Sequence, residues 1–418
     1  MRILWLSNCT LTDAPTAATG SWLQAMSQAL VRSGNVELYN ITFGNSREFV
    51  RHDSGNIQQW LIPKVHLRNG MPQQSVTDDL CRLIDHINPH IVHIWGVESF
   101  WGLLSSRQYI TRPVLLEIQG LMYTCADVYM GGLSIGETIA GIAPIDWIMP
   151  RHNILRAKAK FYNWGKYEKE ILRTQRYIST QSQWVKAAIA PYCNPHAHIF
   201  DTLMAVRTPF MTSEPWCNSF NNKSIELLSV ASSALPYKGV HIAIKALAIL
   251  KQFYPNIVLK IVGDYRQNKK SFKRGGYVRF LEQLIRRYHL TDNVRFLGSL
   301  PTEQLVAAMQ QSHVMLHTSH IESYSLALAE AMAVGVPSVI AYAGAMPELA
   351  QNGVSGLFYS PCDYRQCAQQ VRCIIENPHL AQRLSQAARV TAQQRNNIDD
   401  VVKRQIDIYN TIIANNYK

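Results

Sequence analysis

The chain has 418 residues, of which 47% are hydrophobic and 17% charged, and its formal net charge is +12. This length exceeds what one compact core accommodates and favours two domains, while the composition excludes a disordered chain. The basic excess suits a nucleotide ligand, an anionic membrane surface or nucleic acid, and does not choose among them.

The spacing of the cysteines and the hydropathy of the chain indicate where in the cell the protein works. The eight cysteines form no C-x-x-C pair and no zinc spacing, which is typical of reduced thiols in a cytoplasmic protein, and no metal site is expected. No stretch approaches the roughly 20 consecutive apolar residues that cross a bilayer. Any membrane contact is therefore expected to be peripheral.

The chain begins with a predicted strand, loop and helix. Buried strands are expected at residues 3–6 and 36–42, and a loop of small residues between them ends at Gly20, before a helix over 21–34. Glycine lets a ligand approach the backbone closely, and this order of elements forms the phosphate-facing unit of doubly wound folds. Gly20 is therefore a candidate ligand-facing residue, with an ordinary helix start as the alternative.

Two further strands, 91–96 and 114–118, lead to polar residues. Glu98 follows the first strand and Gln119 follows the second. Open α/β sheets bind ligands beyond the carboxyl ends of their strands, so Glu98 is a candidate for substrate contact. Gln119 can both donate hydrogen bonds to hydroxyl groups and accept them. His93, inside the first strand, is more typical of a buried core histidine.

Residues 145–176 mix aromatic with basic side chains. Interfacial segments combine apolar anchors with Lys and Arg in this way, which favours contact with an anionic membrane. The alternative is a solvated basic helix packed by its aromatic residues. The membrane interpretation fails if Trp147, Phe161 and Trp164 are buried in the core of the first domain.

The second half restarts the alternation of strands and helices after a polar, proline-bearing linker at 208–224, the predicted domain boundary. A strand at 225–231 leads to Lys238 and Gly239, directly before a helix over 240–253. A lysine at a helix start is well placed to neutralise a diphosphate. A surface charge is the less favoured alternative for Lys238.

A strand at 314–316 precedes a helix expected from Ser325 to Val334, which ends at Gly335. Glu330 is the only charge on this apolar helix, and a buried carboxylate needs hydrogen-bond donors. Ser325 and Glu330 are separated by roughly 7–8 Å of helical rise, about the reach from a diphosphate to the ribose of one nucleotide. A core Glu paired with Lys or Arg is the alternative.

Glu322 and Glu330 form E-x7-E within S-x-x-E-S-x-S-x-x-x-x-E-A-M-A-x-G-V-P-S-V. This segment resembles the signature of retaining nucleotide-sugar glycosyltransferases of family 4, which have the GT-B architecture. The resemblance implies that Glu322 faces the donor sugar as a catalytic residue and that Glu330 binds the ribose. Ser323, Tyr324 and Ser325 stand where the family more often has Gly-Phe-Gly, at the anion site.

The resemblance covers much of the chain. Lys238 and Gly239 match the end of the family motif G-R-x-x-x-x-K-G, whose Arg falls on Ser233. Gly263 belongs to a segment similar to I-V-G-D, and Leu297 to a strand that lies beside the nucleobase. These five residues are implied to bind the donor.

The first half also resembles one subgroup. Many family members place a His that meets the donor sugar where this chain has Gln119, and the I-Q-G segment resembles bacterial surface polysaccharide enzymes. Arg207, in a segment similar to the subgroup's path into the linker, is implied to face the acceptor cleft, with a structural salt bridge as the alternative.

The expected fold is α/β and GT-B-like, with two doubly wound parallel-sheet domains facing a central cleft. Residues 1–207 form the acceptor-side domain, onto which the C-terminal helix at 396–418 packs back. Residues 208–395 form the nucleotide-sugar-binding domain.

The expected function is transfer of a hexose from a UDP- or GDP-sugar to a saccharide or lipid-linked saccharide acceptor, without a metal or other cofactor. The expected location is cytoplasmic, with peripheral attachment to the inner membrane face. Alternatives are a sugar-nucleotide epimerase of the same architecture, an inactive scaffold, or a basic nucleic-acid or membrane-binding module. Nucleic acid ranks low because the sequence has no recognised motif for it.

Overall fold

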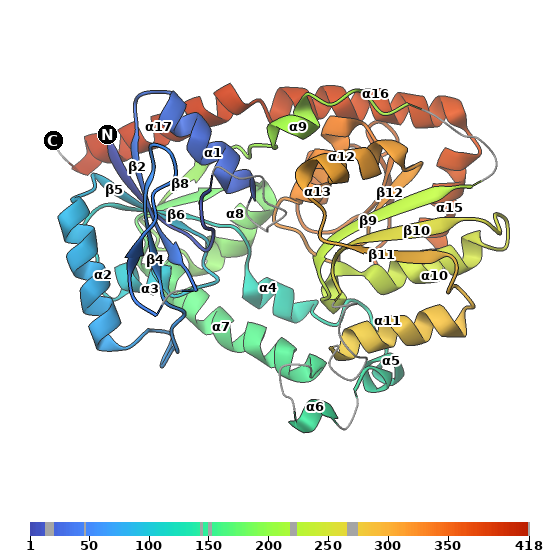
Figure 1. Ribbon diagram of the computed structural model, residues 1–418, viewed down its shortest axis with the longest axis horizontal. Helices are drawn as coiled ribbons and strands as arrows, with labels where there is room; N and C mark the ends of the chain where they lie inside the picture. The colour runs from blue at the N-terminus through green and yellow to red at the C-terminus, as the bar shows by residue number, and fades with distance from the viewer. Residues whose placement is uncertain are drawn as a thin grey trace. The chain divides into compact units, whose positions relative to one another are not determined.

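The computed structural model describes residues 1–12, 21–45, 47–142, 145–148, 153–217, 224–265 and 275–416 (Figure 1). The chain divides into two compact units. The first comprises residues 1–123, 162–207 and 396–418, and the second comprises 124–161 and 208–395. Residues 124–161, which the sequence division keeps in the N-terminal domain, therefore group with the second unit.

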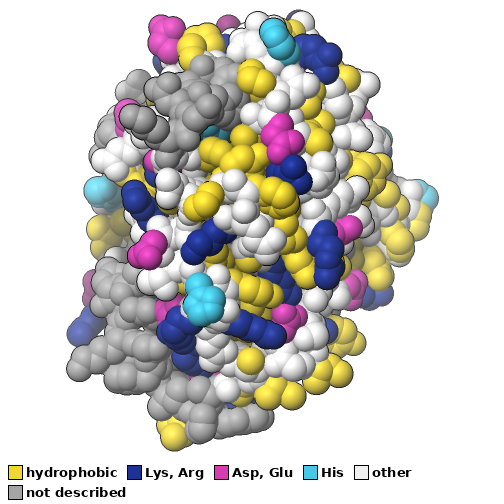
Figure 2. All heavy atoms as spheres, turned by 90° about the vertical axis from the view of Figure 1, so that its right-hand side faces the viewer, with side chains coloured by type: hydrophobic (Ala, Val, Ile, Leu, Met, Phe, Trp, Pro, Cys, Tyr) yellow, Lys and Arg dark blue, Asp and Glu magenta, His cyan; other side chains and the backbone are white. Residues whose placement is uncertain are grey.

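The surface charge is mixed on the face shown in Figure 2. Cationic side chains are interspersed there with acidic, apolar and uncharged ones (Figure 2). Within the described part of the chain, no helix is both long and apolar enough to cross a membrane.

The first unit is built on an eight-stranded sheet in the order β3-β4-β2-β1-β5-β6-β7-β8. All neighbouring strands are parallel except the antiparallel pair β3 and β4. The strands are β1 (Arg2–Leu6), β2 (Glu37–Phe43), β3 (Val50–Arg51), β4 (Gln58–Ile62), β5 (Ile91–Trp95), β6 (Val114–Glu117), β7 (Tyr177–Thr180) and β8 (His198–Asp201).

Helices cover both faces of this sheet, because successive side chains of a strand point to opposite faces. Leu115 packs in one cluster, with Trp5 and side chains of α1 and α17, while Leu116 packs in another, with side chains of α2, α3, α7 and α8. The helices of this unit are α1 (Ser21–Arg32), α2 (Gln74–Ile87), α3 (Trp101–Ser106), α8 (Gln183–Ile189) and α17 (Ile398–Asn416). Two helices cross the division between the units: α4 (Met122–Asp127) after residue 123, and α7 (Ile154–Thr174) after residue 161. The doubly wound architecture of this half is confirmed.

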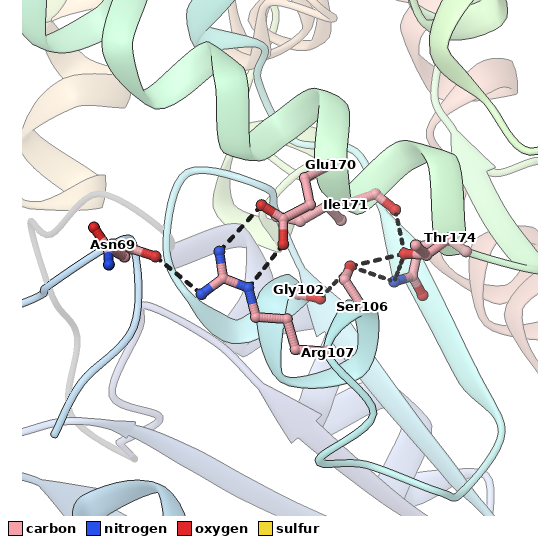
Figure 3. Close-up of polar contacts among 8 residues, drawn as sticks. Asn69, Gly102, Ser106, Arg107, Glu170, Ile171 and Thr174 are labelled. Carbon is pink, nitrogen blue, oxygen red and sulfur yellow. Dashed lines mark hydrogen bonds and ion pairs between the residues drawn. The ribbon is translucent and has the colours of Figure 1, made fainter. Parts of the chain in front are cut away.

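The C-terminal part of α7 is fixed to α3 by close packing and an ion pair (Figure 3). A Cβ at Gly102 would lie 2.8 Å from Ile171, so glycine allows this approach. Arg107 donates two hydrogen bonds to the Glu170 carboxylate, at 2.7 and 3.1 Å, and one to the Asn69 carbonyl at 2.9 Å. Two hydrogen bonds from one guanidinium to one carboxylate fix the relative orientation of the two helices as well as their contact.

The aromatic residues of α7 are packed. Trp164 is half-buried against the first unit's core, and its indole N–H donates to the Val97 carbonyl at 2.8 Å. Phe161 contacts Tyr129 and Tyr237 of the second unit edge-on. Both residues are packed, as the packed-helix interpretation expects, but both are only half-buried, and only Trp164 packs against the core of the first unit. The side chain of Trp147 lies outside the described residues.

The second unit has a six-stranded parallel sheet in the order β11-β10-β9-β12-β13-β14. Its strands are β9 (Glu226–Ser233), β10 (Val258–Asp264), β11 (Val294–Gly298), β12 (Val314–His317), β13 (Ser338–Ala341) and β14 (Leu357–Tyr359). Helices α10 (Val240–Leu250) and α11 (Gly276–Arg287) lie on one side of this sheet, and α12 (Thr302–Gln311) and α13 (Leu326–Val334) on the other (Figure 1).

The remaining elements of the second unit surround this core. They are α5 (Ile135–Ala140), α6 (Ile145–Ile148), α9 (Thr208–Met211), the 3₁₀ turn η3 (Pro236–Lys238), α14 (Met346–Leu349), α15 (Tyr364–Ile375) and α16 (Pro378–Arg395). Both faces of the sheet are covered, so this half is doubly wound as well.

Candidate active site

Helix α13 starts and ends as the sequence predicts. Ser325 is its N-cap and Gly335 its C-cap, both in the left-handed conformation. The Ser325 hydroxyl accepts a hydrogen bond from the Leu328 N–H at 3.4 Å. The first N–H groups of a helix have no intrahelical acceptor, and the helix dipole makes this end favourable for anions.

Lys238 and Glu322 meet beside this helix end. The lysine Nζ lies 2.7 Å from Glu322 Oε1, and their side chains are only 20% and 17% exposed. They come from the loops that follow β9 and β12, which are adjacent strands. The structure thus brings together two predicted residues that are 84 positions apart in the sequence.

Gly239 allows these two loops to touch. Its φ is 69°, and a Cβ there would lie 1.9 Å from the Thr318 carbonyl oxygen. The Thr318 hydroxyl donates to the Lys238 carbonyl at 3.0 Å, and the His320 N–H donates to the Tyr237 carbonyl at 2.7 Å. Because backbone bonds join the loops, the position of Lys238 follows from the fold.

The backbone of Glu322 is supported from the other side by a turn that sequence reasoning did not assign to the site. A Cβ at Gly344 would lie 2.2 Å from the Glu322 carbonyl oxygen, and the Ala345 N–H donates to that oxygen at 2.8 Å. The signal in the sequence was Gly344 itself, a glycine directly before Ala345-Met346-Pro347.

Glu330 is buried, with 5% of its surface exposed, as the apolar character of α13 predicts. Tyr324, at the preceding turn, is buried too and lies under the guanidinium of Arg395, 5.9 Å from the ring centre. Arg395 also donates to the Leu349 carbonyl. Glu330 thus lies on the same packed helix as the N-terminus that favours anions, somewhat more than one helical turn away from it.

The histidines beside the Glu322 turn are neutral at neutral pH. Burial lowers the pKa of His317 to about 3 and that of His320 to about 4. Lys238, and not these imidazoles, therefore supplies positive charge next to Glu322.

The remaining donor candidates follow neighbouring strands. Ser233 ends β9 and pairs in register with Asp264 of β10. A Cβ at Gly263 would lie 1.9 Å from the Ala231 carbonyl oxygen, so glycine is required for these strand ends to stay close. Leu297 lies in β11, two strands from β9. Ser323 belongs to the turn between Glu322 and Ser325.

In the first unit, Glu98 and Gln119 lie together at the carboxyl ends of β5 and β6. The Glu98 carboxylate lies over Gly96 and Gly120, where added Cβ atoms would be 2.1 and 2.9 Å from its oxygens. Burial raises the pKa of Glu98 to about 7, against hydrogen bonds from backbone N–H groups that include that of Gly120. The Gln119 Nε2 is buried and has no acceptor among the described residues.

Sequence reasoning missed Glu168, which lies in the basic stretch. Its carboxylate accepts hydrogen bonds from the Met122 and Tyr123 N–H groups, at 2.7 and 2.9 Å, just after Gln119 and Gly120. Burial, with a smaller contribution from the nearby Glu98, raises its pKa to about 8. Only the fold places this helix residue beside the strand ends.

The structure does not test a ligand-binding role for two of the predicted site residues. Gly20 lies outside the described residues. Arg207 is half-buried at the last position of the first unit's middle segment, directly before α9.

Part of the chain matches a known protein family. Residues 212–391 match the family described as Glycosyl transferases group 1. A glycogen synthase of Mycobacterium tuberculosis is 32% identical over 186 residues, which cover 44% of this chain and 41% of that protein. The alignment thus spans about two fifths of the relative's length.

Solved structures are similar over the whole chain. Sucrose-phosphate synthase from Thermosynechococcus elongatus has a TM-score of 0.71 at 17% identity, covering 99% of both chains. Anabaena HepE in complex with UDP-glucose has a TM-score of 0.65 at 17% identity, covering 98% of this chain and 100% of that one. Residues 212–391 therefore form a glycosyltransferase group 1 domain, within a chain of the GT-B fold.

Proposed function

We propose that this protein is a retaining family 4 glycosyltransferase, which moves a hexose from a UDP- or GDP-sugar to a saccharide acceptor in surface polysaccharide biosynthesis. The observation that carries the proposal is the meeting of Lys238 and Glu322 beside the N-terminus of α13. A cation and free helix N–H groups at one place favour a diphosphate. The similarity to HepE, whose structure contains UDP-glucose, supports a nucleotide-sugar donor.

In this mechanism, catalysis is electrostatic. Negative charge grows on the departing diphosphate, and Lys238 and the α13 N-terminus stabilise it where it forms. Without a donor, Glu322 is the counterion of Lys238. A diphosphate carries more charge than one carboxylate and competes for the lysine, which leaves Glu322 to accept hydrogen bonds from the donor's sugar.

Glu330 provides the second anchor. A carboxylate accepts hydrogen bonds from both hydroxyls of a ribose. The rise from Ser325 to Glu330 is roughly 7–8 Å, which matches the span from diphosphate to ribose. The helix thus holds the nucleotide at both points.

Calorimetry tests this proposal. We expect UDP or GDP to bind the wild type, and Glu330→Ala to weaken that binding at least tenfold by removing the ribose acceptor. Glu303→Ala, which changes an exposed carboxylate on α12, is the matched control and should bind like the wild type. If neither nucleotide binds above background, the proposal is wrong. Conversion of the donor sugar without any acceptor would indicate the epimerase instead.

We also propose that the protein attaches peripherally to an anionic membrane surface. The support is a set of exposed side chains on α6 and the first two turns of α7: Ile148 is 78% exposed, and Leu155, Arg156 and Lys160 are exposed as well. Apolar and cationic side chains together suit an anionic bilayer. We expect the wild type to sediment with phosphatidylglycerol vesicles. A double variant, Ile148→Ser with Leu155→Ser, should sediment with them to a smaller extent. Equal recovery with neutral and anionic vesicles would contradict this attachment.

A further inference from the structure

The first unit contains a pocket of about 450 Å³ at the amino ends of β6 and β7. The end of α3, the loop before β6, the loop between α7 and β7, and the end of α17 line it, with residues Ser105, Thr111, Arg112, Pro113, Val114, Thr174, Gln175, Arg176, Tyr177 and Asn416. None of these residues belongs to the candidate active site. Glu98 and Gln119 follow the carboxyl ends of β5 and β6, and the four residues of β6 alone span roughly 10–13 Å.

Hydrogen bonds between side chains hold one wall of this pocket in place. The Ser106 hydroxyl donates to the Gly102 carbonyl at 3.0 Å, and the Thr174 hydroxyl donates to the Ile171 carbonyl at 2.9 Å (Figure 3). Gln175, which is 2% exposed, joins the ends of α3 and α7, because its amide nitrogen donates to Ser106 Oγ at 3.3 Å. The pocket is therefore part of the packed structure of this unit.

Two arginines bring positive charge to the pocket. The guanidinium of Arg176 lies over the ring of Tyr177, 5.3 Å from its centre, and the Tyr177 hydroxyl accepts a hydrogen bond from Asn416 at 3.0 Å. A guanidinium that stacks on a ring keeps its N–H groups free for a ligand. Arg112 is half-buried in the loop before β6. Neither arginine forms an ion pair with a carboxylate among the described residues.

The helix ends at the pocket do not cancel this charge. Helices α3, α7 and α17 end here, and a helix C-terminus carries about half a negative charge, so three ends amount to roughly 1.5 against two guanidiniums. Carbonyls in the last turns of these helices already accept hydrogen bonds from side chains, namely those of Gly102, Ile171 and Ile412. The arginines therefore remain available for a ligand.

The loop before β6 adds further donors. Within the described part of the chain, the N–H groups of Thr111 and Arg112 donate to no backbone carbonyl. Backbone N–H groups beside a guanidinium suit the oxygens of an anion. This loop therefore offers a phosphate both charge and hydrogen bonds.

The size and chemistry of the pocket indicate the class of ligand. Guanidinium groups match the geometry of phosphate oxygens. The volume lies within the range of small-molecule pockets, about 300–1,000 Å³, and exceeds what a phosphate group alone fills. The hydroxyls of Ser105, Thr111 and Thr174 can donate to hydroxyl groups and accept from them.

We infer that this pocket binds a small phosphate monoester with a hydroxylated body. Arg112 and Arg176 hold the phosphate, and the hydroxyl side chains of the wall hold the remainder of the molecule. The pocket shares no residue with the Lys238–Glu322 site, so this binding is independent of the proposed function.

Calorimetry on the full chain tests the pocket with glycerol 3-phosphate, ribose 5-phosphate and inorganic phosphate, and with glycerol and ribose as uncharged probes. We expect at least one monoester to bind the wild type, and Arg112→Gln and Arg176→Gln each to weaken this binding at least tenfold. Arg82→Gln, which changes an exposed arginine of α2, is the matched control and should bind like the wild type. Lys238→Ala should leave binding in this pocket unchanged.

Thr111→Glu provides a variant that leaves both arginines in place. Thr111 is exposed, so the added carboxylate does not disturb the core, and we expect its negative charge to abolish monoester binding. Thermal unfolding of each variant shows whether it folds as the wild type does.

Several outcomes would overturn the phosphate monoester site. They are the absence of monoester binding to the wild type, unchanged affinity in folded Arg112→Gln and Thr111→Glu variants, or loss of binding in Lys238→Ala. Glycerol or ribose that binds as tightly as its phosphate would refute the role of the arginines. Inorganic phosphate that binds as tightly as both monoesters would show a site for the free ion instead.

Discussion

Ser325 has an unusual backbone for a residue with a side chain, with φ 71° and ψ 78° at the N-cap of α13. The left-handed conformation costs a non-glycine residue roughly 1–2 kcal/mol, and strain of this kind clusters at ligand sites. The hydroxyl offsets part of the cost by capping the helix.

Two substitutions separate strain from capping. Ser325→Ala keeps the strain and loses the cap, so we expect it to lower the free energy of unfolding by about 0.5–2 kcal/mol. Ser325→Gly loses the cap but removes the strain, so its stability should equal or exceed that of the wild type. Urea denaturation of the three proteins checks this order, and an alanine variant as stable as the glycine variant would contradict it.

Glu117 is a residue whose protonation state is set by its burial. It is fully buried in β6, where Ser179 is its hydrogen-bond partner and its Oε1 has none among the described residues. Burial raises its pKa from 4.5 to about 8. The folded state therefore binds a proton that the unfolded state releases, and this group's contribution to stability falls as pH rises from about 4.5 to about 8.

Glu117→Gln should remove this pH dependence, because an amide does not ionise. We expect the variant to gain stability relative to the wild type between pH 5 and 8, by at most ~1.4 kcal/mol per pH unit. Denaturant titrations across this range measure the difference. Asp53→Asn is a suitable control, because the arginine at 51 lowers the pKa of that exposed carboxyl. A constant difference between Glu117→Gln and wild type at all pH values would refute the assignment.

Helix α17 is held to the first unit by a polar contact inside an apolar surface. Tyr409 is fully buried, and its hydroxyl accepts a hydrogen bond from Trp5 Nε1 at 3.2 Å and lies 2.7 Å from His93 Nδ1. His93 is thus a core histidine, as its strand position predicts. Both partners lose this hydroxyl if the tyrosine becomes phenylalanine.

Tyr409→Phe should destabilise the first unit by about 1–3 kcal/mol, because it leaves buried polar groups without a partner. Tyr162→Phe, at an exposed tyrosine of α7, should have little effect. Thermal and urea unfolding of the two variants provide the comparison. Equal stabilities would show that the hydroxyl contributes nothing to holding α17.

The whole molecule is not divided in simple sequence order, because residues 396–418 belong to the first unit and 124–161 to the second. The Lys238–Glu322 pair and helix α13 both lie in the second unit. Nucleotide binding and the integrity of α17 are therefore expected to depend on different parts of the chain.

Truncation after Arg395 tests this division. Removing α17 exposes the apolar face that Trp5 and Leu115 share with it, so limited proteolysis should cut the first unit much faster than in the full chain. The second unit keeps its own core, and fragments from it should resist proteolysis as in the full chain. Equal protection of the first unit in both proteins would contradict the prediction.

The local sequence determined much of what matters here. The bounds of α13 and the burial of Glu330 followed from a run of apolar residues between Ser325 and Gly335, because caps and hydrophobic patterns act over a few residues. The strand alternation likewise predicted both sheets. Tertiary structure alone decided the rest. The contact of Lys238 with Glu322 and the grouping of residues 124–161 with the second unit both depend on packing between segments far apart in the chain, which no local pattern encodes.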